Sequence, residues 1–368
     1  MRILHVASGD LWAGAENQLY LLAGAQASDA ETVVTVVLMN DGILADRLRH
    51  AGIHVVVVDE RSHSVAQTVR AVARLIKQRR IDIVHTHRAK ENLVGALAVL
   101  LSGRGASLRT AHGSPERPTS DYSMRERIIG VVDRFVGRYL QACVVAVSSE
   151  LQDRLSAFYP ASHLQTVANG IAELHDQQIF RHRASDETLV LACIGRLVSV
   201  KRFDVSIAAF HAARQMLRQP VELWVVGDGP LLSHLKEQAT QLGIAGHVRF
   251  LGFVENIPAL LADVDLLLVP SDHEGMPMVV LEAMRQRVLV IAHAVGGLPE
   301  VLDSGRAGIL LPTQDPVSWA NAIRDSARIE PRRVMLSEAE RRVHDRFSIS
   351  ATAAAYRSIY SRLAKSER

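Results

Sequence analysis

Short β-branched runs alternate with longer helix-period segments along this chain, and the alternation occurs twice within 368 residues. Strand and helix in strict alternation predict an α/β fold with a parallel, doubly wound sheet. In the first half the predicted strands are Ile3–Ala7, Thr32–Leu38, Ile53–Asp59, Ile81–Thr86, Leu108–Ala111, Cys143–Val147 and Gln165–Ala168. In the second half they are Leu189–Ile194, Val221–Val226, Val248–Leu251, Leu266–Val269, Leu289–Ala292 and Gly308–Leu311. The sequence therefore predicts two Rossmann-like domains in tandem.

The alternation breaks near Asn169-Gly170-Ile171, where a polar stretch from Glu173 to Glu187 precedes the next predicted strand. We expect a first domain over residues 1–172 and a second over residues 173–345, because this length exceeds one ordinary core. A last helix within residues 346–368 has no sheet of its own and is expected to pack back on the first domain. The predicted helices are Leu44–His50, Val65–Gln78, Asn92–Leu101, Glu126–Leu140, Phe203–Leu217, Leu231–Leu242, Ile257–Ala262, Met278–Gln286, Val317–Arg328, Pro331–His344 and Ile349–Ala364.

Hydropathy and cysteine usage indicate a cytoplasmic protein. The N-terminal apolar run Met1–Val6 is too short for a signal peptide, and no run approaches the roughly 20 apolar residues that span a bilayer. The two cysteines, Cys143 and Cys193, each lie inside an apolar run and are expected to be buried thiols in a reducing compartment.

Positive charge is concentrated between Arg61 and Arg138, where 15 Lys and Arg face 6 Asp and Glu. Such a field attracts phosphates of nucleic acid, anionic lipid or a lipid diphosphate. Nucleic acid ranks last, because no aromatic residues interleave with these charges. Within this stretch, the predicted helix from Arg125 to Leu140 is basic and amphipathic. It could lie on an anionic membrane as a peripheral helix or simply pack on the surface of its domain. Arg127, Arg134 and Arg138 are expected near one face of this helix, with Ile128, Val131, Val132 and Phe135 on another.

The segment Pro270–Ala283 follows a predicted buried strand and places Glu274 in a turn and Glu282 in the following helix, with Pro277 at a plausible first helical position. A helix N-terminus favours an anion such as phosphate. Carboxylates on either side of that anion could accept hydrogen bonds from hydroxyls, which is the pattern of a nucleotide sugar. The alternative is that both acids are simply solvated.

Other candidate residues follow predicted strands, and ligands of open parallel sheets bind outside the carboxyl ends of the strands. Arg196 and Lys201, after strand Leu189–Ile194, are suited to clamping a diphosphate. Gly14 opens a helix after the first strand and lets a ligand approach its backbone, although the run lacks the G-x-G-x-x-G pattern of dinucleotide binding. His112 ends strand Leu108–Ala111 and is expected to face the cleft that two such domains would form.

The run Val84–Lys90 supplies a second set of candidates. His85 and His87 are expected at a strand end, with Arg88 and Lys90 beside them, on the acceptor side of the cleft. The two-residue spacing of the histidines matches a metal pair only weakly, and no acidic or cysteine partner lies at ligand spacing. We therefore predict no bound metal.

Taken together, these motifs resemble glycosyltransferase family 4, the retaining GT-B enzymes also called glycosyl transferases group 1. The resemblance covers nearly the whole chain in the expected order. Its most specific part is Glu274-Gly275-x-Pro277 to Glu282-Ala283, with two acids eight residues apart. The other matching motifs are Gly195-Arg196 with Lys201, Gly296-Gly297-Leu298-Pro299-Glu300, Gly14-Ala15-Glu16, His112-Gly113, Val147-Ser148, Asn169-Gly170-Ile171 and Gly227-Asp228-Gly229-Pro230.

The resemblance implies a role for each matching residue. Arg196 and Lys201 would hold the donor diphosphate, Glu282 the ribose, and Glu274 the transferred sugar. His112 would approach that sugar from the other domain. Donor contacts are also implied for the backbone of Gly275, Met276, Pro277 and Met278, for that of Gly14, and for Phe253 and Val254 beside the base.

In this family transfer retains the anomeric configuration without a bound metal or other cofactor, and the leaving phosphate helps to deprotonate the acceptor. Three departures stand out. Arg287 and Leu289 occupy positions where the family commonly has Gly and Pro, Ala13 replaces a frequent Gly, and His293 stands where Thr is often found.

The leading hypothesis is a hexosyltransferase that moves a sugar from a nucleotide diphosphate to a lipid-linked or saccharide acceptor in bacterial envelope, lipopolysaccharide or exopolysaccharide synthesis. One alternative is a GT-B nucleotide-sugar epimerase, which would turn over donor without acceptor. Another is a protein that binds nucleotide sugar without reacting.

Overall fold

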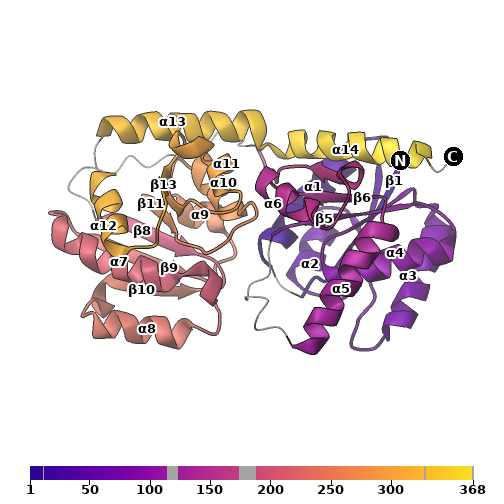
Figure 1. The fold of residues 1–368 in the computed structure, drawn as a ribbon, viewed down its shortest axis with the longest axis horizontal. Helices are drawn as coiled ribbons and strands as arrows, with labels where there is room; N and C mark the ends of the chain where they lie inside the picture. Colours follow the sequence, from indigo (N-terminus) through magenta and orange to yellow (C-terminus); the bar gives the residue numbers. More distant parts are fainter. Residues whose placement is uncertain (11, 114–122, 174–187, 327–328, 367–368) are drawn as a thin grey trace. The chain divides into compact units, whose positions relative to one another are not determined.

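The structure is a computed structural model that describes residues 1–10, 12–113, 123–173, 188–326 and 329–366. The chain divides into two compact units. The first comprises the described residues of 1–113, 118–172 and 348–368, and the second those of 173–347. Each unit is built on one parallel sheet with helices on both faces (Figure 1).

The first unit has a seven-stranded sheet in the order β3-β2-β1-β4-β5-β6-β7. The β-branched runs form its strands because such side chains pack well on a pleated, buried surface. The strands are β1 (Arg2–Ala7), β2 (Val33–Leu38), β3 (His54–Val57), β4 (Ile83–Thr86), β5 (Ala106–Ala111), β6 (Cys143–Ala146) and β7 (Leu164–Thr166). The chain order reverses between β1 and β4, where His5 lies opposite His85 in the register.

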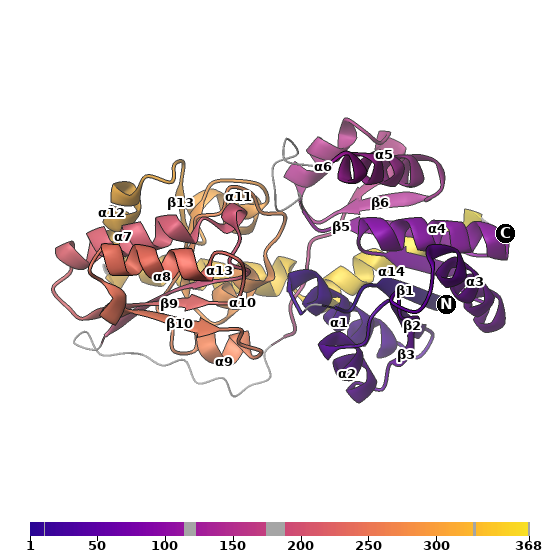
Figure 2. The ribbon, with the colours of Figure 1, turned by 90° about the horizontal axis from the view of Figure 1, so that it is seen from below.

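Helices cover both faces of this sheet (Figure 2). The apolar side chains of α3 (Val65–Arg79) and α4 (Ala89–Ser102) pack on one face, and those of α1 (Gly14–Ala27) and α2 (Ile43–His50) pack on the other. The unit also contains α5 (Met124–Tyr139) and α6 (Ser149–Ser156). The last helix, α14 (Ile349–Ser366), packs on the first unit through Tyr356, Ile359, Tyr360 and Leu363, as the sequence predicts.

The second unit has a six-stranded sheet in the order β10-β9-β8-β11-β12-β13. Its strands are β8 (Leu189–Ile194), β9 (Val221–Val226), β10 (Val248–Gly252), β11 (Leu266–Val269), β12 (Leu289–His293) and β13 (Ile309–Leu311). Helices α7 (Phe203–Met216), α8 (Leu232–Gln241) and α12 (Pro316–Asp325) bury one face around Phe210 and Trp319. Helix α10 (Met278–Arg285) packs on β12 and against α9 (Ile257–Leu261) and α13 (Ile329–Arg346). A short helix α11 (Leu298–Val301) follows β12.

Most sequence-predicted elements appear within one or two residues of their expected bounds, and the exceptions have local reasons. Helices α1 and α6 were not assigned bounds from the sequence. Helix α1 carries apolar side chains on both sides, which hides the amphipathic period, and α6 is only eight residues long. Pro277 is the N-cap of α10 in extended backbone, so the prediction that it is the first helical residue was wrong by one position. The polar stretch Glu173–Glu187 lies almost wholly outside the described residues.

Both cysteines are buried free thiols, which confirms that part of the sequence analysis. Burial raises the pKa of Cys143 to about 11 and that of Cys193 to about 12, so neither is a reactive thiolate near neutral pH. Among the described residues, no helix is both long enough and apolar enough to cross a membrane.

Candidate active site

The chain order of the second sheet reverses between its neighbouring strands β8 and β11. In a doubly wound sheet the loops leaving two such strands diverge, and ligands bind in the crevice that opens between them. Here the loop after β8 carries Arg196 and Lys201, and the loop after β11 carries Glu274. The topology therefore brings the sequence-predicted cations and acid to the same edge of the sheet.

Lys201 and Glu274 meet directly. The Lys201 Nζ lies 2.7 Å from Glu274 Oε1, and the Ser271 hydroxyl donates to the same oxygen over 2.6 Å. Glu274 is 8% exposed and the Lys201 side chain 26%, so the pair lies at the boundary between interior and solvent. A charge-assisted ion pair that is partly buried is stronger than one on the open surface. This pair holds the Lys201 cation beside Glu274, in the loop that precedes α10.

The backbone around Glu274 is fixed by a glycine loop after β12. Gly296 adopts a φ of +56°, and a Cβ built there would lie 1.8 Å from the Glu274 carbonyl oxygen. The Gly297 N–H donates to that oxygen over 3.0 Å. Only glycine allows this approach, which gives a physical reason for Gly296 in the sequence.

A second set of contacts ties the β8 loop to the β11 loop. The Asp272 N–H donates to the Val200 carbonyl over 2.8 Å. The Arg202 guanidinium donates to Asp272 and to Gln314, and the Gln314 amide in turn donates to the carbonyl of Pro270. The positions of Lys201 and Glu274 are thus set by their neighbours before any ligand arrives.

The remaining donor-side candidates lie along the same edge. Gly275, Met276 and Met278 are buried, and Pro277 is half-buried. Glu282, on the second turn of α10, is 7% exposed, and its charge partly opposes the lowering of the pKa of Arg285 by burial.

Arg196 is exposed in the loop after β8. After β10, Phe253 is 48% exposed and donates its N–H to Asp228 over 3.0 Å, while Val254 is half-buried. A Cβ at Gly227 would lie 2.0 Å from the Gly195 carbonyl oxygen, so the loops after β8 and β9 also touch.

In the first unit, the switch point between β1 and β4 holds a small polar pocket. It is lined by Ala7, Ser8, Ala15, Glu16, Leu19, His87, Arg88 and Glu91. Glu16 pairs with Arg88, and the Ser8 hydroxyl donates to Glu91. Burial raises the pKa of both carboxyls, against the opposing effect of Arg88 on Glu16 and of the Ser8 hydrogen bond on Glu91. One oxygen of each, Glu16 Oε2 and Glu91 Oε2, is buried without a partner among the described residues. Gly14 begins α1 next to this pocket and is exposed.

Beside the pocket four histidine rings form a row, in which His5, His85 and His87 are buried and His112 is half-buried. His87 stacks on His85 with ring centroids 4.4 Å apart, and His5 and His112 lie 5.5 and 5.4 Å from His87. Burial lowers the pKa of His5 and His112 to about 4, and that of His85 and His87 well below the ordinary value. The charge of Arg88 also lowers the pKa of His112. All four rings are therefore neutral near physiological pH.

The structure changes the roles expected for the run Val84–Lys90. His85 lies inside β4 rather than at its end, it is fully buried, and both ring nitrogens are hydrogen-bonded at 2.7 Å, to Tyr360 and Thr110. It is therefore a core residue, because its ring packs against Tyr356 and Tyr360 of α14, and its role on the acceptor side stays a prediction. Lys90 pairs with Glu60. His87 and Arg88, by contrast, line the pocket.

The ligand nitrogens of His5, His85 and His87 all lie within 4.8 Å of one another. Their rings, however, are tilted or stacked, and the nitrogens already hydrogen-bond to other groups. An ion there would have to displace these hydrogen bonds, which join the rings to one another and to Gln26, Tyr360 and Thr110. The absence of a bound metal stays a prediction.

Sequence analysis missed several residues that these contacts reveal. Nothing in the spacing of Ser271 and Arg202 shows that they hold the Lys201–Glu274 pair. His5 and Gln26 were missed as well. A histidine inside the apolar strand Ile3–Ala7 breaks the pattern expected of a buried strand, and that break is the signal that could have found it.

Two Rossmann-like units, with cations and an acid gathered at the switch point of the second, define a nucleotide-binding enzyme of the GT-B class. Known proteins agree with this class. Residues 12–173 match the profile of Glycosyltransferase Family 4, and residues 175–343 match that of Glycosyl transferases group 1. The N-acetyl-alpha-D-glucosaminyl L-malate synthase of Bacillus anthracis is 30% identical over 304 residues, covering 78% of this chain and 77% of that protein.

Two further proteins extend the comparison. An Escherichia coli UDP-Gal:alpha-D-GlcNAc-diphosphoundecaprenol alpha-1,3-galactosyltransferase is 24% identical over 265 residues, covering 68% of this chain and 67% of that protein. The crystal structure of Anabaena Alr3699/HepE in complex with UDP-glucose superposes with a TM-score of 0.84 at 23% identity, over 98% of this chain and all of that one. The chain belongs to glycosyltransferase family 4, and it is a glycosyltransferase that uses a nucleotide sugar.

Proposed function

We propose that this enzyme transfers a hexose, with retention of configuration, from a nucleotide-diphosphate sugar bound at the β8–β11 switch point. The observation that carries the proposal is the Lys201–Glu274 pair at 2.7 Å, with Ser271 and Arg202 holding it in place. In the ground state the pair is ready to accept an anion beside Lys201 and a sugar hydroxyl beside Glu274. Preorganised charge of this kind stabilises a transition state without rearrangement.

Each residue has a task in this proposal. Lys201 and Arg196 neutralise the charge that develops on the diphosphate as the glycosidic bond breaks, and the N–H groups at the start of α10 assist them. Glu274 accepts from a hydroxyl of the sugar, together with the backbone from Gly275 to Met278, and Glu282 accepts from the ribose. Phe253 and Val254 flank the base. The acceptor oxygen attacks the anomeric carbon from the face that the phosphate leaves, and its proton passes to the departing phosphate, so no carboxylate serves as a nucleophile.

We assign the acceptor to the first unit, where His87, Arg88 and Gly14 surround the pocket at the β1–β4 switch point. Arg88 offers a guanidinium to a phosphate or carboxylate of the acceptor. Relatives act on both kinds: the Bacillus anthracis protein's name specifies L-malate, and the Escherichia coli protein's name specifies a diphosphoundecaprenol-linked sugar. We propose a lipid-linked or saccharide acceptor in bacterial envelope polysaccharide synthesis, with the enzyme cytoplasmic and peripheral on the membrane.

The helix α5 favours the lipid-linked acceptor. Its buried residues are only Val136 and Gly137, while Met124 is 74% exposed and Phe135 55% exposed. The helix is held to its unit by polar contacts instead, since Asp133 pairs with the buried Arg109 at 2.7 Å and accepts from Asn92. The apolar side chains left facing outward are Met124, Ile128, Ile129, Val131, Val132, Phe135 and Tyr139.

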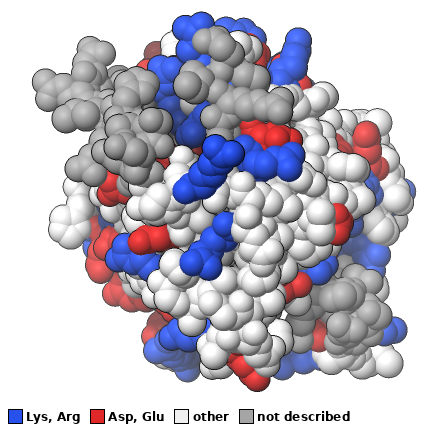
Figure 3. All heavy atoms as spheres, turned by 90° about the vertical axis from the view of Figure 1, so that its left-hand side faces the viewer, with Lys and Arg blue, Asp and Glu red and all other residues white. Residues whose placement is uncertain are grey.

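Basic side chains flank this apolar surface. Arg134 lies over the Phe158 ring at 4.9 Å, and Arg138 donates to the Phe158 carbonyl. Apolar side chains bordered by arginines are what an anionic bilayer surface takes up. On the face of the second unit shown in Figure 3, the described basic and acidic side chains are instead interspersed.

The membrane assignment predicts that the double variant Ile128→Asp/Phe135→Asp loses binding to vesicles that contain phosphatidylglycerol, measured by flotation, by about tenfold or more. Both side chains are exposed, so the fold should be retained. The matched control is Val317→Asp/Val334→Asp, which changes two exposed valines of the second unit and should bind as the unaltered protein does. Equal binding of all three proteins would exclude α5 as the contact.

A thermal-shift screen of nucleotide diphosphates and their sugars tests the donor assignment. A ligand at about 100 times its dissociation constant stabilises the protein by about 2.7 kcal/mol. We expect one base to stand out, with transfer that requires an acceptor. Donor turnover to a sugar epimer without acceptor would indicate an epimerase, and binding without any turnover a sensor; either result would overturn the transferase assignment.

A further inference from the structure

The histidine row of the first unit is one continuous hydrogen-bonded chain. His112 Nε2 lies 3.2 Å from His87 Nδ1, and His87 Nε2 lies 3.2 Å from His5 Nδ1. His5 Nε2 lies 2.8 Å from the Gln26 side-chain oxygen. The chain runs from the interior of α1 to the loop after β5, and the roles given above to His87 and His112 do not explain why their rings are joined to His5 and Gln26.

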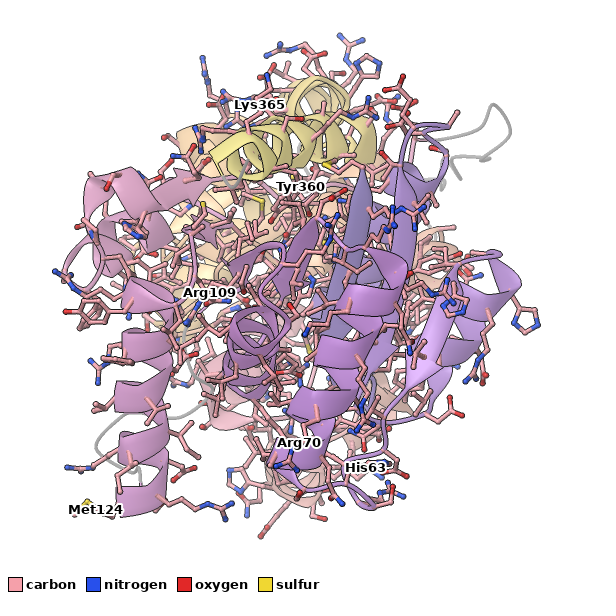
Figure 4. The ribbon with its side chains drawn as sticks, turned by 90° about the vertical axis from the view of Figure 1, so that its right-hand side faces the viewer. His63, Arg70, Arg109, Met124, Tyr360 and Lys365 are labelled. Carbon is pink, nitrogen blue, oxygen red and sulfur yellow. The ribbon has the colours of Figure 1, made fainter. Side chains whose placement is uncertain are left out.

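The chain has a direction, because its inner end is an acceptor. The Gln26 amide donates its N–H to the Tyr360 hydroxyl at 3.2 Å and therefore turns its oxygen to His5. Tyr360 points from α14 into the sheet and lies 2.7 Å from His85 Nδ1 (Figure 4). An amide oxygen can only accept, so the proton in the Gln26–His5 contact belongs to His5 Nε2.

A neutral imidazole offers one donor and one acceptor. The tautomer of His5 therefore determines that of His87, and His87 in turn determines that of His112. With its proton on Nε2, His5 accepts at Nδ1 from His87 Nε2–H. His87 then accepts at Nδ1 from His112 Nε2–H. The outer nitrogen, His112 Nδ1, is left with a lone pair, and it is the one ring nitrogen of the row without a hydrogen-bond partner among the described residues.

We propose that Gln26, His5 and His87 are positioning residues that fix the tautomer of His112, so that His112 presents an unprotonated Nδ1 as a hydrogen-bond acceptor to a substrate hydroxyl. The proposal rests on the proposed transfer function for the identity of the hydroxyl, and on the row itself for the tautomer. A ring free to change tautomer would present a donor part of the time and would repel the same hydroxyl proton. The row thus connects substrate recognition to α14 through Tyr360.

The tautomer can be read without any ligand. In protein labelled with nitrogen-15 histidine, the ring nitrogens of His112 should show a bare Nδ1 and a protonated Nε2 near neutral pH, with the signals assigned from their loss in His112→Asn. A protonated Nδ1 on His112 in the unaltered protein would overturn the proposal. This result does not depend on whether the protein transfers sugar.

Two variants at His5, which does not line the pocket, form a matched pair. His5→Gln keeps one acceptor and one donor, so it can still accept from His87 and donate to Gln26. His5→Met has a similar size and offers neither. We expect His5→Gln to retain the His112 tautomer and His5→Met to show a mixture, with circular dichroism confirming that both fold. An unchanged tautomer in His5→Met would refute the relay.

The contribution of the His112 tautomer to sugar transfer is tested in kinetic assays with the donor that the thermal-shift screen identifies. His5→Met should lower kcat/KM by about fivefold, the size expected for one neutral hydrogen bond, and His5→Gln should restore most of it. With monodeoxy analogues of donor and acceptor, the analogue lacking the recognised hydroxyl should react equally with His5→Met and the unaltered enzyme. An altered tautomer with unchanged kcat/KM would show that the row does not serve transfer.

Discussion

Replacing Lys201 by methionine is expected to lower sugar transfer about a hundredfold or more. The variant lacks the partly buried ammonium group that, in the proposed mechanism, stabilises the leaving diphosphate. Glu274→Gln should cause a loss of similar size in kcat, since the amide no longer offers a full negative charge to the sugar hydroxyl. Steady-state kinetics with the identified donor measures both. The control is Lys236→Met, which removes an exposed lysine from α8 of the same unit and should leave transfer unchanged.

The Lys201 variant is also expected to lose folding stability, and this loss must be separated from its effect on the rate of transfer. Without Lys201 the carboxylate of Glu274, 8% exposed, loses a charged partner, and breaking such a pair costs several kcal/mol when it is buried. The double variant Lys201→Met/Glu274→Gln removes both charges and should recover most of the lost stability. If Lys201 binds the diphosphate, the affinity for nucleotide diphosphate measured by calorimetry stays weak in the double variant. Recovered affinity would mean that Lys201 serves only to neutralise Glu274.

Much of the fold follows from local pattern. The strand bounds of β8, β9 and β11 agree with the sequence prediction to the residue. Strands β8 and β11 are continuous apolar runs between polar turns, and β9 is apolar apart from Glu222. Helix α1 had no predicted bounds because both of its sides meet apolar neighbours, against β1 and β2 on one side and against α14 on the other. A helix covered on several sides loses the one-sided pattern that marks an amphipathic helix.

The location of the candidate site follows from the strand order, which can be predicted from the sequence. The contacts that fix its side chains cannot be predicted in this way. Strand alternation alone brings the loops of Lys201 and Glu274 to one sheet edge. The closeness of Gly296 to the Glu274 carbonyl depends on how the loop after β12 folds, which no spacing encodes. His85 shows the opposite error: β4 ends at Thr86 as predicted, but Tyr356 and Tyr360 of α14 cover the His85 ring, a long-range contact that the strand pattern does not show.

The helix α5 illustrates a third limit. The sequence shows that it is amphipathic and basic, but an apolar stripe is read by default as the buried side of a helix. The structure turns that stripe outward, because Arg109 and Asp133 occupy the inner side with an ion pair and Gly137 lets Arg109 approach. Long-range polar partners decided the orientation, and these are invisible to periodicity.

The histidine row should make the first unit sensitive to acid. An unfolded histidine titrates near 6.5, whereas burial keeps the pKa of His5 at about 4 and that of His85 and His87 well below 6.5. Between those values the unfolded state binds more protons than the folded state, so the free energy of unfolding falls as the pH falls below about 6.5 and stops falling once the folded groups protonate. The pKa of His112 is also lowered, to about 4. Each group contributes at most about 1.4 kcal/mol per pH unit, so the four histidines give an upper limit of about 5.5 kcal/mol per pH unit.

Two carboxyls act in the opposite sense. Burial raises the pKa of Glu16 and Glu91, so the folded state takes up their protons first and gains stability on acidification. Four histidines against two acids leave a net loss, which we expect to be about 2 to 4 kcal/mol between pH values of about 6.5 and 5, a large share of the roughly 5–15 kcal/mol typical of a domain. Amide exchange offers an internal comparison: the amides of β1 and β4 should lose protection over this range, while those of β8 and β11 in the second unit keep theirs. Protection of β1 and β4 that holds or rises on acidification would mean that the histidines do not remain neutral when the unit folds.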